Sequence, residues 1–236
     1  MDKAVVIGGA GFVGSHVADE LSRRGYRVTV FDQDRSPWVT DNQEMLVGDM
    51  RDQAALTKAI SDARFLYHFG GIADIDECHK NPLSTIRYNI LGNAQILESA
   101  IRNKVKKFLF ASSVYVYSSS GTFYRISKQS SELFIESFAE ENDMDYVILR
   151  YGSLYGGRAD NRNSLYRIIE NALKYKKIDY YGDGNEIREY INVKDAADLS
   201  VEALDEKYSN QILMLTGKKS IKYEQYQQLI KISDSY

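Results

Sequence analysis

The stretch VVIGGAGFVGSHVADEL, residues 5–21, decides the fold of this chain. It starts as a short apolar run typical of a buried strand and ends in a helical pattern, with glycines at 8, 9, 11 and 14 between them. Glycines at this spacing permit a tight turn, a close approach of the backbone to a ligand and the packing of helix on strand. The pattern predicts a strand–loop–helix unit whose helix N-terminus binds the pyrophosphate of a dinucleotide.

Acidic residues after the next two apolar runs indicate how the rest of that dinucleotide is held. Asp32 ends the second run, where a carboxylate accepts both hydroxyls of an adenosine ribose and repels a 2′-phosphate. NAD is therefore expected rather than NADP, although the nearby Arg35 is a residue type that accommodates a 2′-phosphate. Asp49 and Met50 follow the third run and are expected at the adenine, while Asp52 has the position of a helix N-cap.

Apolar runs and amphipathic segments alternate over most of the chain, which is typical of an α/β protein with a parallel sheet. We expect a Rossmann-type, doubly wound parallel sheet in one domain, residues 1–236, with residues from about 151 on forming a small substrate-binding elaboration. The expected strands are 3–8, 26–32, 44–49, 64–70, 107–113, 145–151, 178–181 and 212–216. The expected helices are 15–24, 53–61, 83–103, 127–142, 164–175, 194–206 and 223–232.

Composition excludes several classes of function. A net charge of −3 gives no indication of a nucleic-acid surface, and no apolar run approaches the roughly 20 residues that span a bilayer. The single cysteine, Cys78, excludes an internal disulfide and suits a reducing compartment, so we expect a cytoplasmic protein without a signal peptide. The three histidines show no metal-ligand spacing, and no metal is expected.

The stretch SSVYVYSSSGTFYRISKQ, residues 112–129, carries the candidate chemistry. Tyr124 and Lys128 are four residues apart at the start of a helical segment, which puts them on one face. A tyrosine that acts as a base near pH 7 needs its pKa lowered by about three units, or roughly 4 kcal/mol. A lysine cation and the positive nicotinamide are suited to supply this. Ser112 and Ser113 end the preceding strand, and each offers a hydroxyl to a substrate oxygen.

The other two tyrosines of this stretch, Tyr115 and Tyr117, are two residues apart. In a strand-like continuation of the preceding run they share one face of the sheet. We therefore expect packing or pocket-wall roles for them.

These motifs together resemble the extended short-chain dehydrogenases/reductases, the family of nucleotide-sugar epimerases and dehydratases. The resemblance covers nearly the whole chain, with the motifs in family order. It rests on the loop glycines, Asp32, Asp49 and the Ser113, Tyr124, Lys128 set, and on three further segments: NILGNAQILESA (89–100), LRYGSLYGGR (149–158) and YYGDGNEIREYINVKDAAD (180–198).

The resemblance implies a role for each matching residue. Tyr124 takes the hydroxyl proton while a sugar C–H is delivered to NAD as hydride, Ser113 orients the oxygen, and Lys128 holds the nicotinamide ribose. Substrate contacts fall to Ser112, Ser113, Tyr155 and Arg188, of which Arg188 meets the nucleotide phosphates. The cofactor-binding set is Gly8, Gly11, Phe12, Val13, Gly14, Asp32, Asp49, Met50, Phe69, Gly70, Asn89, Tyr124 and Lys128.

The resemblance leaves more than one activity open. Val114 and Tyr115 follow Ser113 where dehydratases carry an acidic pair, so 4,6-dehydration is not expected. A 4-epimerase acting at C4 of a nucleotide-sugar is the leading reading, and a nucleotide-sugar dehydrogenase or keto-sugar reductase is the alternative. The short segment between Ser113 and Tyr124 and the small C-terminal part favour the alternative. A redox-sensing NAD-binding module is the non-enzyme reading.

The family's helices corresponding to 83–101 and 127–138 pair in a four-helix interface, so the resemblance also implies a homodimer. The alternative is that their apolar faces are ordinary core against the sheet.

Overall fold

The computed structural model of the chain describes residues 1–176, 187–218 and 220–222. Its main sheet has seven strands in the order β3-β2-β1-β4-β5-β6-β9, all paired in parallel. The expected Rossmann-type fold is confirmed. The strands are β1 (Lys3–Ile7), β2 (Arg27–Asp32), β3 (Gln43–Val47), β4 (Phe65–His68), β5 (Lys107–Ser113), β6 (Asp145–Tyr151) and β9 (Gln211–Leu215).

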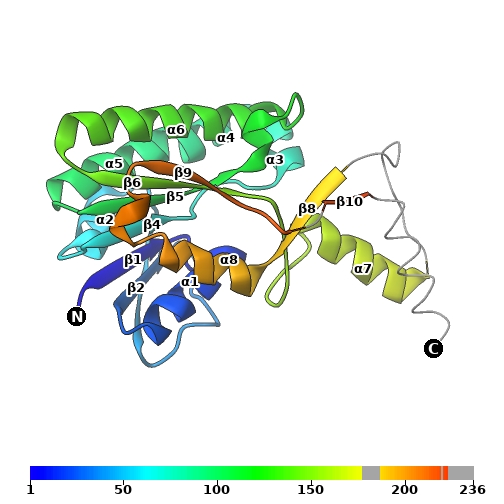
Figure 1. Cartoon of the computed structure of the whole chain (residues 1–236), viewed down its shortest axis with the longest axis horizontal. Helices are drawn as coiled ribbons and strands as arrows, with labels where there is room; N and C mark the ends of the chain where they lie inside the picture. Colours follow the sequence, from blue (N-terminus) through cyan, green and yellow to red (C-terminus); the bar gives the residue numbers. More distant parts are fainter. Residues whose placement is uncertain (177–186, 219, 223–236) are drawn as a thin grey trace.

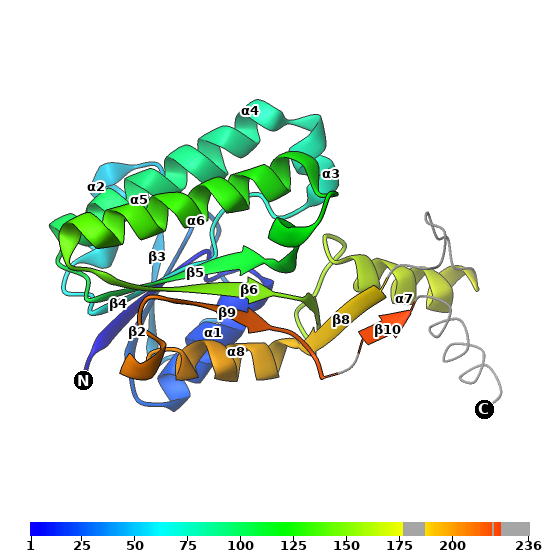
Figure 2. The same ribbon diagram turned by 45° about the horizontal axis from the view of Figure 1, so that its top comes forward.

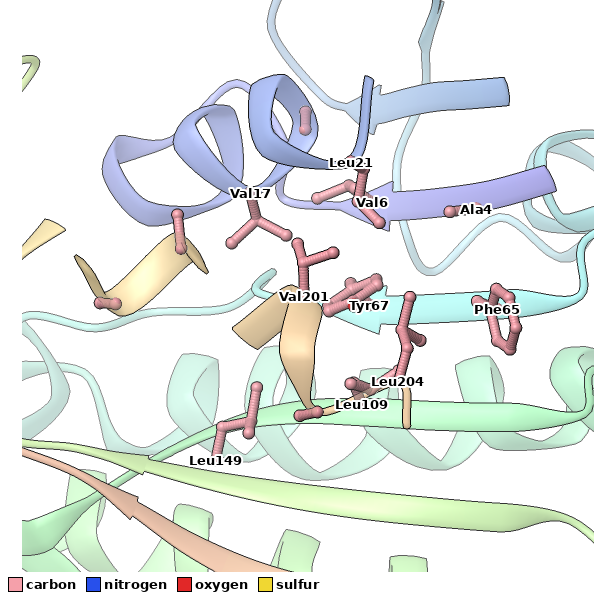
Figure 3. Packing of buried hydrophobic residues seen from close by; sticks show 14 of the residues in the cluster. Ala4, Val6, Val17, Leu21, Phe65, Tyr67, Leu109, Leu149, Val201 and Leu204 are labelled. Carbon is pink, nitrogen blue, oxygen red and sulfur yellow. The ribbon is translucent and has the colours of Figure 1, made fainter. Parts of the chain in front are cut away.

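Helices cover both faces of this sheet (Figure 1). One face carries α1 (Phe12–Arg23) and α8 (Val193–Glu202), and the other carries α2 (Gln53–Ile60), α5 (Gly92–Arg102) and α6 (Thr122–Asn142). A separate apolar core fills each interface, because β1, β4 and β5 are buried on both faces. Figure 3 shows the first core, in which α1 and the α8 region pack on the sheet through Val17, Leu21, Val201, Leu204, Val6, Tyr67 and Leu109.

The strand order reverses between β1 and β4, because β2 and β3 lie beyond β1 on one side and β5, β6 and β9 lie beyond β4 on the other. Ligands of open α/β sheets bind in the crevice at the carboxyl ends of the strands at such a point. The fold therefore places the glycine loop after β1 at the sheet edge where a dinucleotide is expected.

The helix expected over 83–103 is more complex than its sequence pattern suggested. It consists of α4 (Pro82–Thr85), a π-helical turn (Ile86–Leu91) and α5, and it follows a short helix that we did not predict, α3 (Ile75–Lys80). Hydrophobic periodicity does not distinguish one π turn from the α-helix around it. The turn matters because it contains Asn89.

Two other boundaries near the site differ from expectation. Helix α6 begins at Thr122 rather than Ser127, after Gly121 with φ +93°, so Tyr124 and Lys128 lie on the same helix. The strand-like continuation expected for Tyr115 and Tyr117 is wrong: residues Val114–Tyr117 form a 3₁₀ turn. The Ser113 hydroxyl caps that turn by accepting a hydrogen bond from the Tyr115 N–H, 3.3 Å away.

A small second sheet and one helix lie beyond the carboxyl ends of β5 and β6 (Figure 2). Strand β8 (Ile187–Asn192) pairs with β7 (Ser153–Tyr155) in parallel and with β10 (Ser220–Lys222) in antiparallel fashion, beside α7 (Ser164–Tyr175). The strand expected at 178–181 and the helix at 223–232 lie outside the described residues. Among the residues described, no helix has both the length and the apolar character to cross a membrane.

Candidate active site

The glycine loop between β1 and α1 is shaped by close backbone contacts. Gly8 has φ +77°, and a β-carbon there would lie 2.5 Å from the Gly70 nitrogen; one on Gly14 would lie 2.3 Å from the Gly8 oxygen. Gly11 differs, because a β-carbon there would meet only the Gly8 oxygen, at 3.3 Å. Gly8 and Gly14 are therefore needed for the fold itself, whereas Gly11 leaves room for a ligand.

The start of α1 is suited to an anion. No side chain caps its N-terminus at Gly11, and its first turn contains no acidic residue. The free N–H groups and the positive end of the macrodipole are thus left for a ligand. Phe12 packs edge-on against His16, with ring centroids 6.3 Å apart, and Val13 packs against the core. The uncapped N-terminus of α1 therefore fits a pyrophosphate.

Asp32 lies beside this loop at the carboxyl end of β2. One carboxylate oxygen accepts a hydrogen bond from the Ala10 N–H at 2.9 Å, and the other accepts from the Asp34 N–H at 3.4 Å. Both bonds fix the carboxylate next to the loop, where the adenosine ribose is expected.

Asp49 and Met50 have different surroundings. The Arg51 guanidinium lies 2.6 Å from the Asp49 carboxylate, and its hydrogen bond holds the pKa of Asp49 below the usual value. Met50 is buried, and its thioether packs against Gly70 and Gly92. The Met50 side chain therefore belongs to the core, whereas Asp49 is half-buried and its carboxylate is accessible. Asp52 is the N-cap of α2, as the sequence predicted.

Phe69 and Gly70 form the wall opposite the glycine loop. The Phe69 N–H donates to the Ile7 oxygen at 2.8 Å, and its ring stacks on Tyr67 with an interplanar angle of 4°. Because Gly70 also touches Gly8, the backbone after β4 and the loop after β1 meet at the point where the strand order reverses.

The structure brings Ser113, Tyr124 and Lys128 together. Ser113 ends β5, and the other two residues lie one turn apart on α6. The Lys128 Nζ donates to the Ala111 oxygen at 2.8 Å and lies 5.8 Å from the centre of the Tyr124 ring. Side chains from two elements thus converge at the carboxyl end of the sheet.

Burial dominates the electrostatics of this trio. It raises the pKa of Tyr124 to about 12, against a smaller lowering by a hydrogen bond with Ser113. Burial also lowers the pKa of Lys128 to about 8. A group with a pKa of 12 is ionised in about one molecule in 10⁵ at pH 7. The protein alone therefore keeps Tyr124 as a phenol, and the lowering expected from Lys128 is not seen without further positive charge.

Asn89 supports the site through protein contacts. Its amide nitrogen donates to the Ile72 oxygen at 2.9 Å and to the Ser127 hydroxyl at 3.0 Å, and its oxygen accepts from the Ile72 N–H. Ser127 in turn donates to the Tyr124 carbonyl at 2.8 Å. The Asn89 amide therefore connects the loop after β4 to the first turns of α6, and its expected contact with the cofactor stays a prediction.

The Ser112 hydroxyl has a partner within the protein, and its expected contact with substrate stays a prediction. It donates to the buried Glu132 carboxylate of α6 at 2.5 Å. Ser113 remains as the serine of the trio. Sequence reasoning missed Glu132, although its spacing of four residues from Lys128 is a signal for it, and missed its partner Arg150, for which the sequence has no signal.

Two of the residues predicted to contact substrate, Arg188 and Tyr155, lie on the small second sheet. Arg188 of β8 donates to the Tyr115 hydroxyl and lies 5.7 Å above that ring. The Tyr115 ring meets Tyr124 edge-on, with centroids 6.3 Å apart. Arg188 is thus one aromatic ring away from Tyr124, while Tyr155 is 39% exposed at the end of β7.

A model of the NAD dependent epimerase/dehydratase family matches residues 4–214. The chain belongs to this family. NAD is accordingly its cofactor, and the glycine loop, the open face of Gly11 and Asp32 fit that molecule.

Known members of this family are similar to the chain over most of its length. The putative UDP-glucose 4-epimerase of Methanocaldococcus jannaschii is 29% identical over 238 residues, which are 92% of this chain and 77% of that protein. The UDP-N-acetyl-alpha-D-glucosaminuronate decarboxylase of Bacillus cytotoxicus is 28% identical, covering 89% and 74%. The structure of the UDP-glucose 4-epimerase of Thermotoga maritima with UDP-glucose has a TM-score of 0.92 at 27% identity, covering 100% and 83%.

Replacing Asp32 with alanine is expected to change the preference of this epimerase/dehydratase family member for NAD over NADP. The variant loses hydrogen bonds from a charged group, worth about 1.5–3 kcal/mol, so NAD should bind roughly 10- to 100-fold more weakly. NADP should lose less, because the repulsion of its 2′-phosphate is also removed. Titration calorimetry with both cofactors measures this, with Asp34→Ala as the control. An unchanged ratio of the two affinities contradicts the role of Asp32.

Proposed function

We propose that the protein is an NAD-dependent 4-epimerase of a UDP-sugar. The observation that carries this proposal is the convergence of Ser113, Tyr124 and Lys128 at the sheet edge that also holds the glycine loop. Two of the similar proteins are named as UDP-glucose 4-epimerases, which supports the nucleotide and the position of chemistry.

Each residue of the trio has a defined part in the proposed reaction. When bound, NAD supplies a nicotinamide that accepts and returns hydride. Tyr124 takes the proton from the C4 hydroxyl as the C4–H bond breaks, and it returns the proton when the keto-sugar is reduced on its other face. Ser113 orients the oxygen, and Lys128 holds the nicotinamide ribose next to Tyr124. Epimerisation thereby needs no external oxidant.

The second sheet is proposed to bind the nucleotide-sugar. Arg188 carries the positive charge suited to a diphosphate, and it is positioned through Tyr115 close to Tyr124. Tyr155, at the end of the neighbouring strand β7, is proposed to line the sugar pocket. The single domain thus divides into a cofactor part and, from about residue 151, a substrate part.

A nucleotide-sugar dehydrogenase or keto-sugar reductase is the second candidate, and cofactor balance separates it from an epimerase. We expect conversion of a UDP-sugar to its 4-epimer, followed by NMR, without net growth of NADH absorbance at 340 nm. Stoichiometric NADH would establish the dehydrogenase instead. If NAD binds but no UDP-, GDP-, dTDP- or CDP-sugar is converted, the result contradicts both enzyme activities and favours an NAD-binding module that senses redox state. Dehydration remains disfavoured by Val114 and Tyr115.

We also propose a homodimer formed through the outer faces of α4 and α6. Large apolar side chains are exposed there, including Leu83 at 68% and Leu133 at 65% exposure, with Ile126 and Phe134 nearby on α6. Large apolar side chains that are exposed together on neighbouring helices are typical of association sites. Sedimentation of the wild type should give twice the mass of one chain. The Leu133→Glu variant should sediment with the mass of a single chain. We place this dimer in the cytoplasm, in carbohydrate biosynthesis.

A further inference from the structure

A buried ion pair lies one helical turn beyond Lys128, between α6 and β6. The Glu132 carboxylate accepts hydrogen bonds from Arg150 at both oxygens, at 3.0 Å from Nε and 2.6 Å from Nη2. Only 7% of the Glu132 side chain and 13% of the Arg150 side chain are exposed. The same carboxylate accepts from the Ser112 hydroxyl, and the Tyr117 ring covers the guanidinium at 4.6 Å.

The ion pair joins the three elements that make up the site. Glu132 lies on α6 one turn after Lys128 and two turns after Tyr124, so the three share a face of the helix. Arg150 of β6 is the registered neighbour of Ser112 in β5. Ser112 itself stands between Ala111, whose carbonyl accepts from Lys128, and Ser113.

A second connection runs from the guanidinium to the 3₁₀ turn after β5. Arg150 donates to the Tyr117 hydroxyl as well as lying over its ring. That turn also contains Tyr115, which contacts Tyr124 on one side and Arg188 on the other. The Gln129 side chain of α6 adds a further bond, to the Val116 carbonyl at 2.8 Å.

Stability is a weak reason for keeping this pair. Taking two charges out of water costs much of what their attraction returns, and apolar residues of similar volume are often as stable or more stable in such places. An ion pair with bidentate geometry does, however, fix the relative position of the elements that carry it. Because the pair joins α6 to β5 and β6 next to Lys128, its effect is to fix the position of α6 relative to the end of β5.

We propose that Glu132, paired with Arg150, is a positioning residue that holds the ends of β5 and the following turn against α6, so that Ser113 stays within hydrogen-bonding reach of Tyr124. This inference rests on the proposed function of Tyr124 as the base. It predicts that the pair affects the rate of the chemical step, and that it affects neither the affinity for NAD nor the global stability.

The test replaces the whole pair, Glu132→Leu with Arg150→Met, so that no unpaired charge is buried. A displacement of about 1 Å in such a site costs about 100-fold in rate, and we expect a loss of kcat of this size. The Kd for NAD should stay within about twofold, and the thermal midpoint should be unchanged or higher. The acid limb of the kcat profile should move to higher pH, because Tyr124 loses the Ser113 hydrogen bond that lowers its pKa.

The control is the exposed pair Glu98 and Arg102, which lie four residues apart in α5, replaced by leucine and methionine in the same way. It should retain full kcat. Ser112→Ala leaves the charges paired and removes one connection, so it should fold normally and lower kcat by about tenfold. Full kcat in both the double variant and Ser112→Ala overturns the inference.

A crystal structure of the double variant gives a readout that needs no sugar. Displacement of Ser113 from Tyr124, or loss of the Lys128–Ala111 hydrogen bond, supports the inference, and retention of both contacts overturns it. Tyr124→Phe is assayed alongside. If it keeps wild-type turnover, or if wild type itself converts no sugar, the proposed function has failed, whatever the crystal structure of the double variant shows.

Discussion

Tyr124→Phe should abolish most of the turnover while leaving the protein folded and able to bind NAD. Losing a positioned acid–base group lowers rates by about 10²- to 10⁴-fold. The change removes only the hydroxyl, so the edge-on ring contact with Tyr115 is retained. Burial of the tyrosine predicts little change in the thermal midpoint, because phenylalanine fills the same space. The measurement is kcat on the accepted UDP-sugar, together with NAD affinity by calorimetry.

The matched control for that variant is Tyr115→Phe. Its hydroxyl accepts from Arg188 rather than taking part in proton transfer, so we expect a higher KM with kcat close to wild type. Wild-type kcat in Tyr124→Phe, or an equal loss of kcat in both variants, would contradict the assignment of Tyr124 as the base.

Lys128→Met should have opposite effects on activity and stability. Turnover should fall by at least about 100-fold, because the ammonium group lies next to Tyr124 and is proposed to hold the nicotinamide ribose. Stability at pH 7 should rise. Burial lowers the pKa of Lys128 from 10.5 to about 8, which corresponds to about 3 kcal/mol of destabilisation while the amine is charged. The variant also loses the hydrogen bond to Ala111, which destabilises it by about 1 kcal/mol, so its net gain in stability is about 2 kcal/mol.

The pH dependence of this gain has a definite sign. Between about pH 8 and 10.5 the unfolded chain holds a proton on Lys128 that the folded protein has released, so the wild type becomes more stable as the pH rises through that window. The advantage of Lys128→Met should therefore shrink from pH 7 to pH 10. Urea unfolding at both pH values measures it, with the exposed Lys58→Met as control. A variant that is less stable than wild type at pH 7 contradicts the burial argument.

The motifs whose place in the fold followed from the sequence are those that depend on fixed local spacing. The glycines at 8, 11 and 14 and the pair at 124 and 128 are determined by one turn and one helix, so their neighbours along the chain are also their neighbours in space. Asp32 followed from the same logic, because it ends the strand beside β1.

The features that the sequence missed depend on contacts between elements. Ser112 and Ser113 are the same residue type in adjacent positions, so the sequence does not distinguish them. Only the packing of α6 on β5 shows that Ser112 bonds to Glu132. The 3₁₀ turn that carries Tyr115 and Tyr117 follows from the cap at Ser113, which competes with a strand continuation. The π-helical turn at Asn89 has no periodicity of its own. The Glu132–Arg150 pair became visible only when β6 was placed beside β5.

The most direct test of the account uses a UDP-sugar that carries deuterium at C4, with wild-type protein and its bound NAD. If Tyr124 removes the hydroxyl proton while the C4 hydrogen moves to the cofactor and back, NMR of the epimerised product will show deuterium retained at C4, with no net NADH. Exchange of the C4 deuterium with solvent, or formation of one NADH for each product, would contradict transient oxidation by this site.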